Sequence, residues 1–192
     1  MIDRDRILVV AATARELAAP SGWRTLACGV GPVDAAARTA DAIATHRPAA
    51  ILHVGIGGAR RAAALAPPSI VIGSESLYCD LDVPEQFAPR ICLPDAALVA
   101  IARAVLPAAA FLPIGTTARV GGSRECDVEA MEGFSVLRAA ALAGIAAIEI
   151  RAISNEIEES DRVRWHFESA FAAITAITPQ LVDAICARSL DA

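Results

Sequence analysis

A chain of 192 residues is long enough for a proper hydrophobic core, which predicts a single domain over residues 1–192. Its 55% hydrophobic content is rich in alanine and is broken by polar residues before any run reaches about 18, so we expect a soluble protein with no membrane partner. A net charge of -5 without a basic cluster argues against nucleic acid as a partner, and the lack of any lysine excludes a P-loop lysine, a Schiff-base lysine and a lysine general base.

The first elements alternate between strand and helix. Residues 7–12 form a continuous apolar run, which predicts a central strand covered on both faces. A second strand at residues 24–30 leads through a glycine turn into a helix over residues 33–45. Glu16 follows the carboxyl end of the first strand, where position alone favours a solvated acid at a helix start over a catalytic acid.

The middle of the chain predicts two further strands, at residues 50–54 and 69–77. Between them lies the loop Gly55-Ile56-Gly57-Gly58, and three glycines in four residues let a backbone come close to a ligand. The acidic loop after the second strand carries Asp80 and Asp82. These two carboxylates lack a third oxygen ligand, so we predict no metal site there.

The remaining elements complete a pattern of strands that alternate with helices. They are a helix at 94–105, an extended segment at 111–120, a helix at 131–143 with Gly144 as its C-cap, a strand at 147–153, and a helix at 164–187 that Pro179 interrupts. This pattern indicates an α/β fold, a three-layer α/β/α sandwich with a central, mostly parallel, twisted mixed sheet.

The five cysteines are scattered and include no CxxC pair. This spacing argues against a disulfide framework and against a zinc site. The first residues also lack a signal-peptide cleavage pattern, so we expect a cytoplasmic protein in a reducing compartment.

Polar residues gather where predicted strands end and helices begin. In open α/β sheets, ligands bind beyond the carboxyl ends of strands. The residues in such positions are Glu16, the 55–58 loop, Thr116, Thr117, Glu132 and Asn155. This distribution predicts a pocket for a small molecule.

Three of these residues suit the cleavage of a glycosidic bond. Glu132, at a helix N-terminus, would stay ionised and accept hydrogen bonds from two neighbouring sugar hydroxyls. Asn155 can both donate to and accept from a heterocyclic base, and Glu16 is a second carboxylate that could activate water. The residues permit this scheme without requiring it.

Five segments carry a family resemblance. They are ILVVAATAREL from residue 7, CGVGPVDAA from residue 28, HVGIGGA from residue 53, AMEG from residue 130 and IRAISN from residue 150. In order and spacing, the chain resembles the purine nucleoside phosphorylase and nucleosidase superfamily over nearly its whole length. SDRVRW at residues 160–165 is similar to a stretch found in the futalosine hydrolases of that superfamily.

The resemblance implies a role for each site residue. Glu132 would bind the ribose hydroxyls with Met131 packed on the sugar, Asn155 would hold the leaving base, and Glu16 would orient or deprotonate water. The other substrate-binding residues would be Gly55, Ile56, Gly57, Val120 and Ala130. Methylthioadenosine/adenosylhomocysteine nucleosidases carry aspartate where this chain has Asn155, and a neutral amide suits a 6-oxopurine such as the hypoxanthine of futalosine.

The resemblance therefore implies a hydrolase that acts on futalosine in menaquinone biosynthesis, with no cofactor, in a homo-oligomer. Arg15 and Arg60 do not fall where phosphorylases of the hexameric type hold phosphate, which favours hydrolysis. The alternatives are another purine nucleosidase, a nucleoside phosphorylase, or a nucleoside-binding protein without activity. The chain departs from the family in a short segment between Thr116 and Glu129, and in His53, which we expect to be a core residue.

Overall fold

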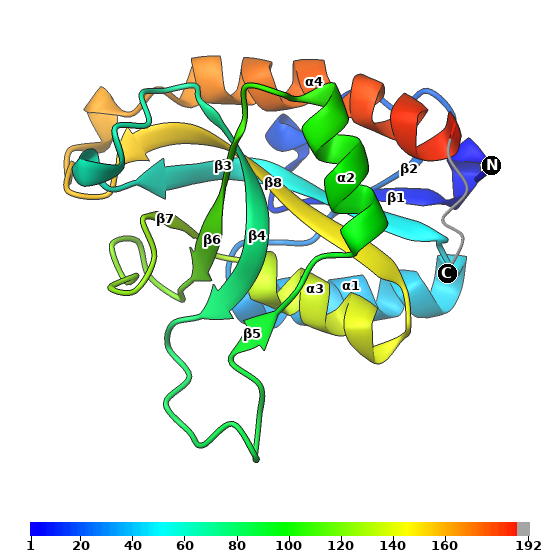
Figure 1. Ribbon diagram of the computed structural model, residues 1–192, viewed down its shortest axis with the longest axis horizontal. Coiled ribbons are helices and arrows are strands. Elements are labelled where there is room, and N and C mark those ends of the chain that lie inside the picture. The colour runs from blue at the N-terminus through cyan, green and yellow to red at the C-terminus, as the bar shows by residue number, and fades with distance from the viewer. Residues whose placement is uncertain (188–192) are drawn as a thin grey trace.

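The computed structural model describes residues 1–187 and arranges them as one sheet between two layers of helices (Figure 1). The strands are β1 (Ile7–Ala11), β2 (Arg24–Ala27), β3 (Ala50–Ala59), β4 (Ile70–Tyr78), β5 (Ile91–Cys92), β6 (Ala110–Thr116), β7 (Val128–Ala130) and β8 (Ala146–Glu156). The helices are α1 (Pro32–His46), α2 (Ala96–Val105), α3 (Gly133–Leu142) and α4 (Phe167–Ala187), with short 3₁₀ turns η1 (Arg4–Arg6), η2 (Ala14–Glu16), η3 (Arg61–Ala63) and η4 (Arg162–Arg164).

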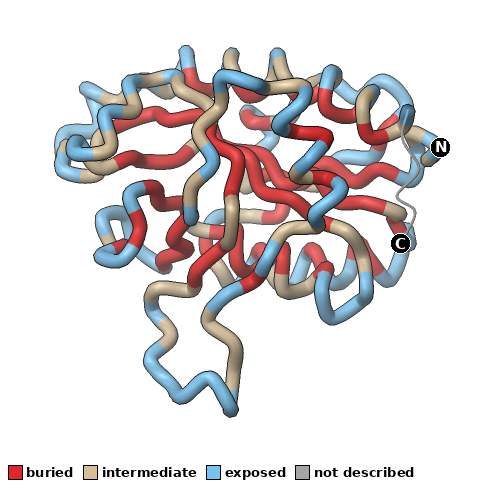
Figure 2. The backbone as a smooth tube through the Cα atoms, viewed as in Figure 1, coloured by how far each residue is buried: buried red, intermediate tan, exposed pale blue. Residues whose placement is uncertain are grey.

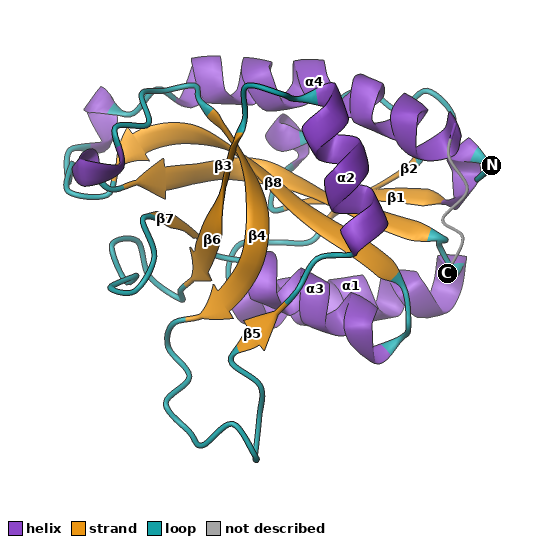
Figure 3. Cartoon of the chain, viewed as in Figure 1, coloured by secondary structure: helices purple, strands orange, loops and turns teal. Residues whose placement is uncertain are grey.

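Helices α2 and α4 cover one face of the sheet, and α1 and α3 cover the other (Figure 3). Strand β1 shows why the apolar run was a reliable signal. Ile7 and Val9 pack in the core on the side of α2 and α4, whereas Leu8 and Val10 pack on the side of α1 and α3. All four are at most 1% exposed, so the expectation of a strand covered on both faces is confirmed (Figure 2).

The sheet is mixed, with more parallel than antiparallel pairings. Strand β1 pairs in parallel with β2 and β3, and β3 pairs in parallel with β8. Strand β8 then pairs antiparallel with β4, which pairs with β6, which pairs with β7, and β7 returns antiparallel to β3. These five strands therefore form a closed ring at one end of the sheet, and the predicted sandwich with a mostly parallel mixed sheet is confirmed.

One prediction about β3 is wrong. The glycines after residue 54 were expected in a loop, but they lie inside a strand that continues to Ala59 and pairs with β8 through a register shift at Gly57/Gly58. The glycines are needed because neighbours come close: a Cβ on Gly55 would lie 2.2 Å from Arg151 Nη1, and one on Gly57 would lie 2.8 Å from the carbonyl oxygen of Glu129.

Other element boundaries also differ from the prediction. Strand β8 extends to Glu156 because β3 continues beside it, so Asn155 lies within a strand and not after it. Strand β2 is short, since its pairing with β1 ends at Ala27. Helix α3 ends as predicted before Gly144, whose φ of +67° suits glycine. Helix α4 runs through Pro179 without the expected interruption.

Helix α4 is long and apolar enough to cross a membrane by length and composition alone. It packs along the sheet instead. Ala170, Ile174, Leu181 and Val182 are buried in the same core cluster as β1 and β3. The apolar face of α4 is thus explained by its burial against the sheet.

Candidate active site

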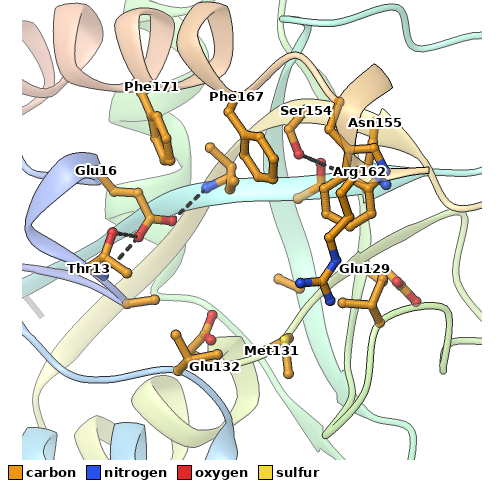
Figure 4. Close-up of a pocket in the computed structure, with 18 residues that line it drawn as sticks. Thr13, Glu16, Glu129, Met131, Glu132, Ser154, Asn155, Arg162, Phe167 and Phe171 are labelled. Carbon is orange, nitrogen blue, oxygen red and sulfur yellow. Dashed lines mark hydrogen bonds between the residues drawn. The ribbon is translucent and has the colours of Figure 1, made fainter. Parts of the chain in front are cut away.

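A cavity of about 320 Å³ lies where β1, β3 and β8 end, between the start of α3 and the start of α4 (Figure 4). Most residues that the sequence predicted for the site line this cavity. They are Glu16, Ile56, Gly57, Val120, Ala130, Met131, Glu132 and Asn155. Gly55 does not line it and packs against Arg151 instead. Thr116 and Thr117 are also outside it and fully buried, and Thr116 Oγ1 accepts a hydrogen bond from Phe134 N at 2.8 Å.

Glu16 is held at one side of the cavity by three hydrogen bonds. Its Oε2 accepts from the backbone N–H and the hydroxyl of Thr13, both at 2.8 Å, and its Oε1 accepts from Ile56 N at 3.1 Å. The side chain is only 4% exposed, so the interpretation of Glu16 as a solvated acid is wrong. A carboxylate has about four acceptor positions, which leaves one for a water molecule or a ligand.

Glu132 is the N-cap residue of α3, but its side chain makes no capping hydrogen bond. Its Oε1 instead accepts from Gly31 N at 3.0 Å, and its Oε2 lies 3.7 Å from Arg151 Nη2. Burial raises the pKa of the Glu132 carboxyl, and the Arg151 charge and the Gly31 N–H oppose that shift only in part. The charged form is therefore held by Arg151 and Gly31, whereas the sequence had suggested the helix dipole.

Asn155 lies on β8 at the opposite side of the cavity from Glu16 (Figure 4). Its Oδ1 accepts from the Ser154 hydroxyl at 2.8 Å, and its Nδ2 donates to the Glu156 carbonyl at 2.9 Å. One amide hydrogen and one oxygen lone pair remain for a ligand. Because the side chain is 5% exposed, such bonds would form in a largely dry environment.

Arg151 is a charged residue that the sequence reasoning missed. Its guanidinium is fully buried, with Nε donating to Glu149 Oε1 at 2.8 Å and Nη2 donating to His53 Nε2. Its Nη2 also lies 3.7 Å from Glu132 Oε2, so Arg151 forms ion pairs both with Glu149 in the core and with Glu132 in the cavity. The available signal was the charge pair Glu149 and Arg151, two residues apart in an apolar strand and hence on one face.

His53 is a core residue, as predicted. It is fully buried, and burial, followed by the positive charge of Arg151, holds its pKa well below the usual histidine value. Its Nδ1 donates to the Val10 carbonyl at 3.1 Å, which leaves Nε2 as the acceptor for Arg151. Within residues 1–187, no group of three or more histidine, cysteine, aspartate or glutamate side chains could hold a metal ion.

Comparison with known protein families matches residues 24–186 to the Phosphorylase superfamily. This match spans well over half of the chain. The chain belongs to the phosphorylase superfamily.

Within the phosphorylase superfamily, one similar protein is the futalosine hydrolase of Streptomyces coelicolor. The two are 35% identical over an alignment of 183 residues in length, and this alignment covers 81% of this chain and 77% of that protein. The solved structures include a methylthioadenosine/adenosylhomocysteine nucleosidase from Colwellia psychrerythraea, with a TM-score of 0.86, 18% identity, and 100% and 99% of the two chains covered. A futalosine hydrolase mutant of Helicobacter pylori gives a TM-score of 0.81, 16% identity, and 93% and 99% coverage. These two likenesses concern the fold.

One wall of the cavity is aromatic, and the sequence analysis did not predict that these aromatic residues belong to the site. Trp165, Phe167 and Phe171 come from the turn before α4 and from its first residues, and all three line the cavity. Their rings follow one another, with centroids 5.4 Å apart for the first pair and 6.1 Å for the second. The spacing of Phe167 and Phe171, four residues apart on one helix face, was the available signal.

The short segment before β7 is ordered by Glu129, which also lines the cavity. Glu129 is 5% exposed, and its two oxygens accept from Gly121 N at 2.5 Å and Ser123 N at 3.0 Å. This segment presents Val120, 41% exposed, to the cavity. The short segment between Thr116 and Glu129 is therefore held in its conformation by the buried carboxylate of Glu129.

Proposed function

We propose that this protein hydrolyses the N-ribosidic bond of futalosine and releases hypoxanthine. The observation that carries the proposal is the cavity itself. It places Glu16, Glu132 and Asn155 around one space in a member of the phosphorylase superfamily that is 35% identical to a futalosine hydrolase. Two carboxylates and one amide suit the cleavage of a nucleoside, because a carboxylate can activate water and the amide can bind the base.

Each of the three groups would then have one task. Glu132 accepts hydrogen bonds from the ribose hydroxyls, with Met131 packed on the sugar. Asn155 binds the 6-oxopurine through its remaining amide hydrogen and lone pair. Glu16 uses its free acceptor position to orient water and take its proton while the sugar passes through an oxocarbenium-like state.

The positions of Arg15 and Arg60 favour hydrolysis over phosphorolysis. Arg15 pairs with Glu168 at 2.5 Å and lies over the Phe171 ring, and Arg60 donates to the carbonyls of Ser123 and Cys126. Neither side chain lines the cavity. With both cations engaged elsewhere, neither is placed to hold a phosphate ion in the cavity.

The direct test is to incubate the protein with futalosine, inosine or methylthioadenosine, with and without phosphate, and to measure the free base. We expect hypoxanthine from futalosine without phosphate, because an amide at residue 155 suits a 6-oxopurine. Release that requires phosphate would identify a phosphorylase. Release of adenine alone would identify a methylthioadenosine nucleosidase and would contradict the proposal.

A pH profile tests the role of Glu132. Its raised pKa means that protonation begins at a higher pH than for an ordinary glutamate, so kcat/KM should fall as the pH drops through a value above about 4.3. The free energy of unfolding should change with pH in the opposite direction to kcat/KM. A buried acid with a raised pKa stabilises the fold at low pH, and this contribution is lost as the pH rises. Acid unfolding caused by Glu132 is thus not expected, and circular dichroism at each pH provides the control. An acid limb at or below about 4.3 would contradict this role.

We further propose that the protein acts in the cytoplasm, in menaquinone biosynthesis, as a homo-oligomer. Support for the last point comes from a second, largely apolar hollow between α1 and α3. Val33 and Leu142 border it and are 77% and 71% exposed. A contiguous apolar surface that is exposed to solvent is typical of a site where another protein binds. Light scattering on the purified protein gives the number of subunits directly.

A further inference from the structure

The leaving base poses a problem that Asn155 alone does not solve. When the bond between C1′ and the purine nitrogen breaks, the electron pair departs with the base, which becomes an anion unless it is protonated. An amide has no acidic proton to give, and one hydrogen of the Asn155 amide is already used by the Glu156 carbonyl. A positive charge near the base would lower the barrier.

Arg162 supplies a positive charge on that side of the cavity. Its side chain lines the cavity, and Figure 4 shows the guanidinium pointing inward toward Met131, on the side of Asn155 and away from Glu16. The guanidinium carbon lies 5.6 Å from the centre of the Trp165 ring. The Trp165 ring is held in place because its Nε1 donates to the Glu159 carbonyl at 2.9 Å. The cation–π contact with this ring therefore helps to position the Arg162 guanidinium.

Arg162 has no carboxylate partner among the described residues, unlike its neighbours. Arg164, in the same turn, pairs with Glu159 at 3.3 Å, and Arg61, beside the end of β8, pairs with Glu156 at 2.7 Å. An arginine that faces a cavity without a partner has five N–H donors available for a ligand.

None of the three carboxylates that line the cavity forms an ion pair with Arg162 in the described part of the chain. Glu129 accepts from two backbone N–H groups of its loop. Glu132 is held by Gly31 and Arg151, and Glu16 is held by Thr13 and Ile56.

We infer that Arg162 is a further catalytic residue, which donates hydrogen bonds to the oxygen and nitrogen edge of the departing 6-oxopurine and stabilises its negative charge. This role rests on the proposed function. The C1′–N bond breaks with its electron pair on the base, water forms the new C1′–O bond, and its proton passes to Glu16. The base anion then takes a proton from solvent, and Glu16 returns its own, so the sum is nucleoside plus water to sugar plus neutral base. A guanidinium stays protonated throughout, so Arg162 acts through its charge and its N–H donors and transfers no proton.

The test compares futalosine with 7-methylfutalosine, whose base already carries a positive charge and leaves as a neutral molecule. Replacing Arg162 with Gln should lower kcat for futalosine about 100-fold, as for the loss of one donor to a developing anion. The loss for the methylated substrate should be far smaller, because no anion forms on its base. Arg162→Lys keeps the charge but not the planar pair of donors, and should lie between the two.

The matched control is Arg164→Gln, which removes an arginine from the same turn but outside the cavity lining. It should leave the ratio of the two rates as in the wild type. Equal losses on both substrates in Arg162→Gln, or the same change of ratio in Arg164→Gln, would overturn the inference. Failure of the proposed function looks different, since the wild type itself would then release no base from futalosine without phosphate.

Discussion

Replacing Glu16 with Gln is expected to lower kcat for base release by about 10²- to 10⁴-fold, the usual contribution of a positioned general base. The substitution keeps the length of the side chain but removes the group that takes a proton from water. The value of KM should change much less, because Glu132 and Asn155 would still hold the sugar and the base.

The hydrogen bonds of Glu16 add an effect on stability. Both of its oxygens accept from N–H donors, Thr13 N on one side and Ile56 N on the other. A glutamine has one carbonyl oxygen, so its NH₂ group would face one of these donors, at a cost of about 1–3 kcal/mol for a buried group left without a partner. Thermal unfolding should therefore show a lower midpoint for the variant, while the protein stays folded at assay temperature.

The control for Glu16→Gln is Glu168→Gln, the same chemical change in an exposed carboxylate that pairs with Arg15 outside the cavity. It should turn over as the wild type does. Single-turnover measurements of hypoxanthine release separate the chemical step from product release. Turnover of Glu16→Gln within about fivefold of the wild type would remove Glu16 from water activation, given the loss expected for a general base.

The fold was largely predictable because its signals are local. The alternation of Ile7 and Val9 to one face, and of Leu8 and Val10 to the other, follows from four consecutive apolar residues. The glycine-rich part of β3 was not predictable in this way. Whether Gly55 and Gly57 form a loop or a strand depends on Arg151 and Glu129, which come close only after the chain has folded.

The site residues also differ in whether a local sequence signal or a contact between distant residues determines their position. Glu132 and Asn155 could be proposed for the site because both lie in short motifs near predicted ends of strands and helices. Glu16 was also expected in the site, but its burial could not be foreseen, because its carboxylate accepts a hydrogen bond from the N–H of Ile56, forty residues away. The sequence did not predict a separate role for Arg162, which lies within the SDRVRW stretch. Nothing in the sequence shows that this arginine lines a cavity or lacks an acidic partner.

Replacing Arg151 with Met should produce the largest loss of stability, about 3–5 kcal/mol in the free energy of unfolding, as expected when one partner of a buried ion pair is removed. Glu149, 1% exposed, would keep only the hydroxyl of Ser76 as a hydrogen-bond partner. Glu132 would lose the nearest positive charge, and His53 Nε2 would lose its donor. Urea unfolding at neutral pH measures the change, with the slope compared between the variants.

A double variant separates the lost ion pair from the lost volume of the arginine side chain. Glu149→Gln removes the buried charge that Arg151 compensates, so adding it to Arg151→Met should restore part of the stability, with a coupling of about 0.5–3 kcal/mol. Arg61→Met, which breaks an exposed ion pair with Glu156, should leave the midpoint nearly unchanged. If the double variant were as unstable as the sum of its two single changes, the buried pair would not be the source of the loss. The same arginine also sets the charge beside Glu132, so a restored fold with residual loss of kcat would assign Arg151 a positioning role that is separate from its contribution to stability.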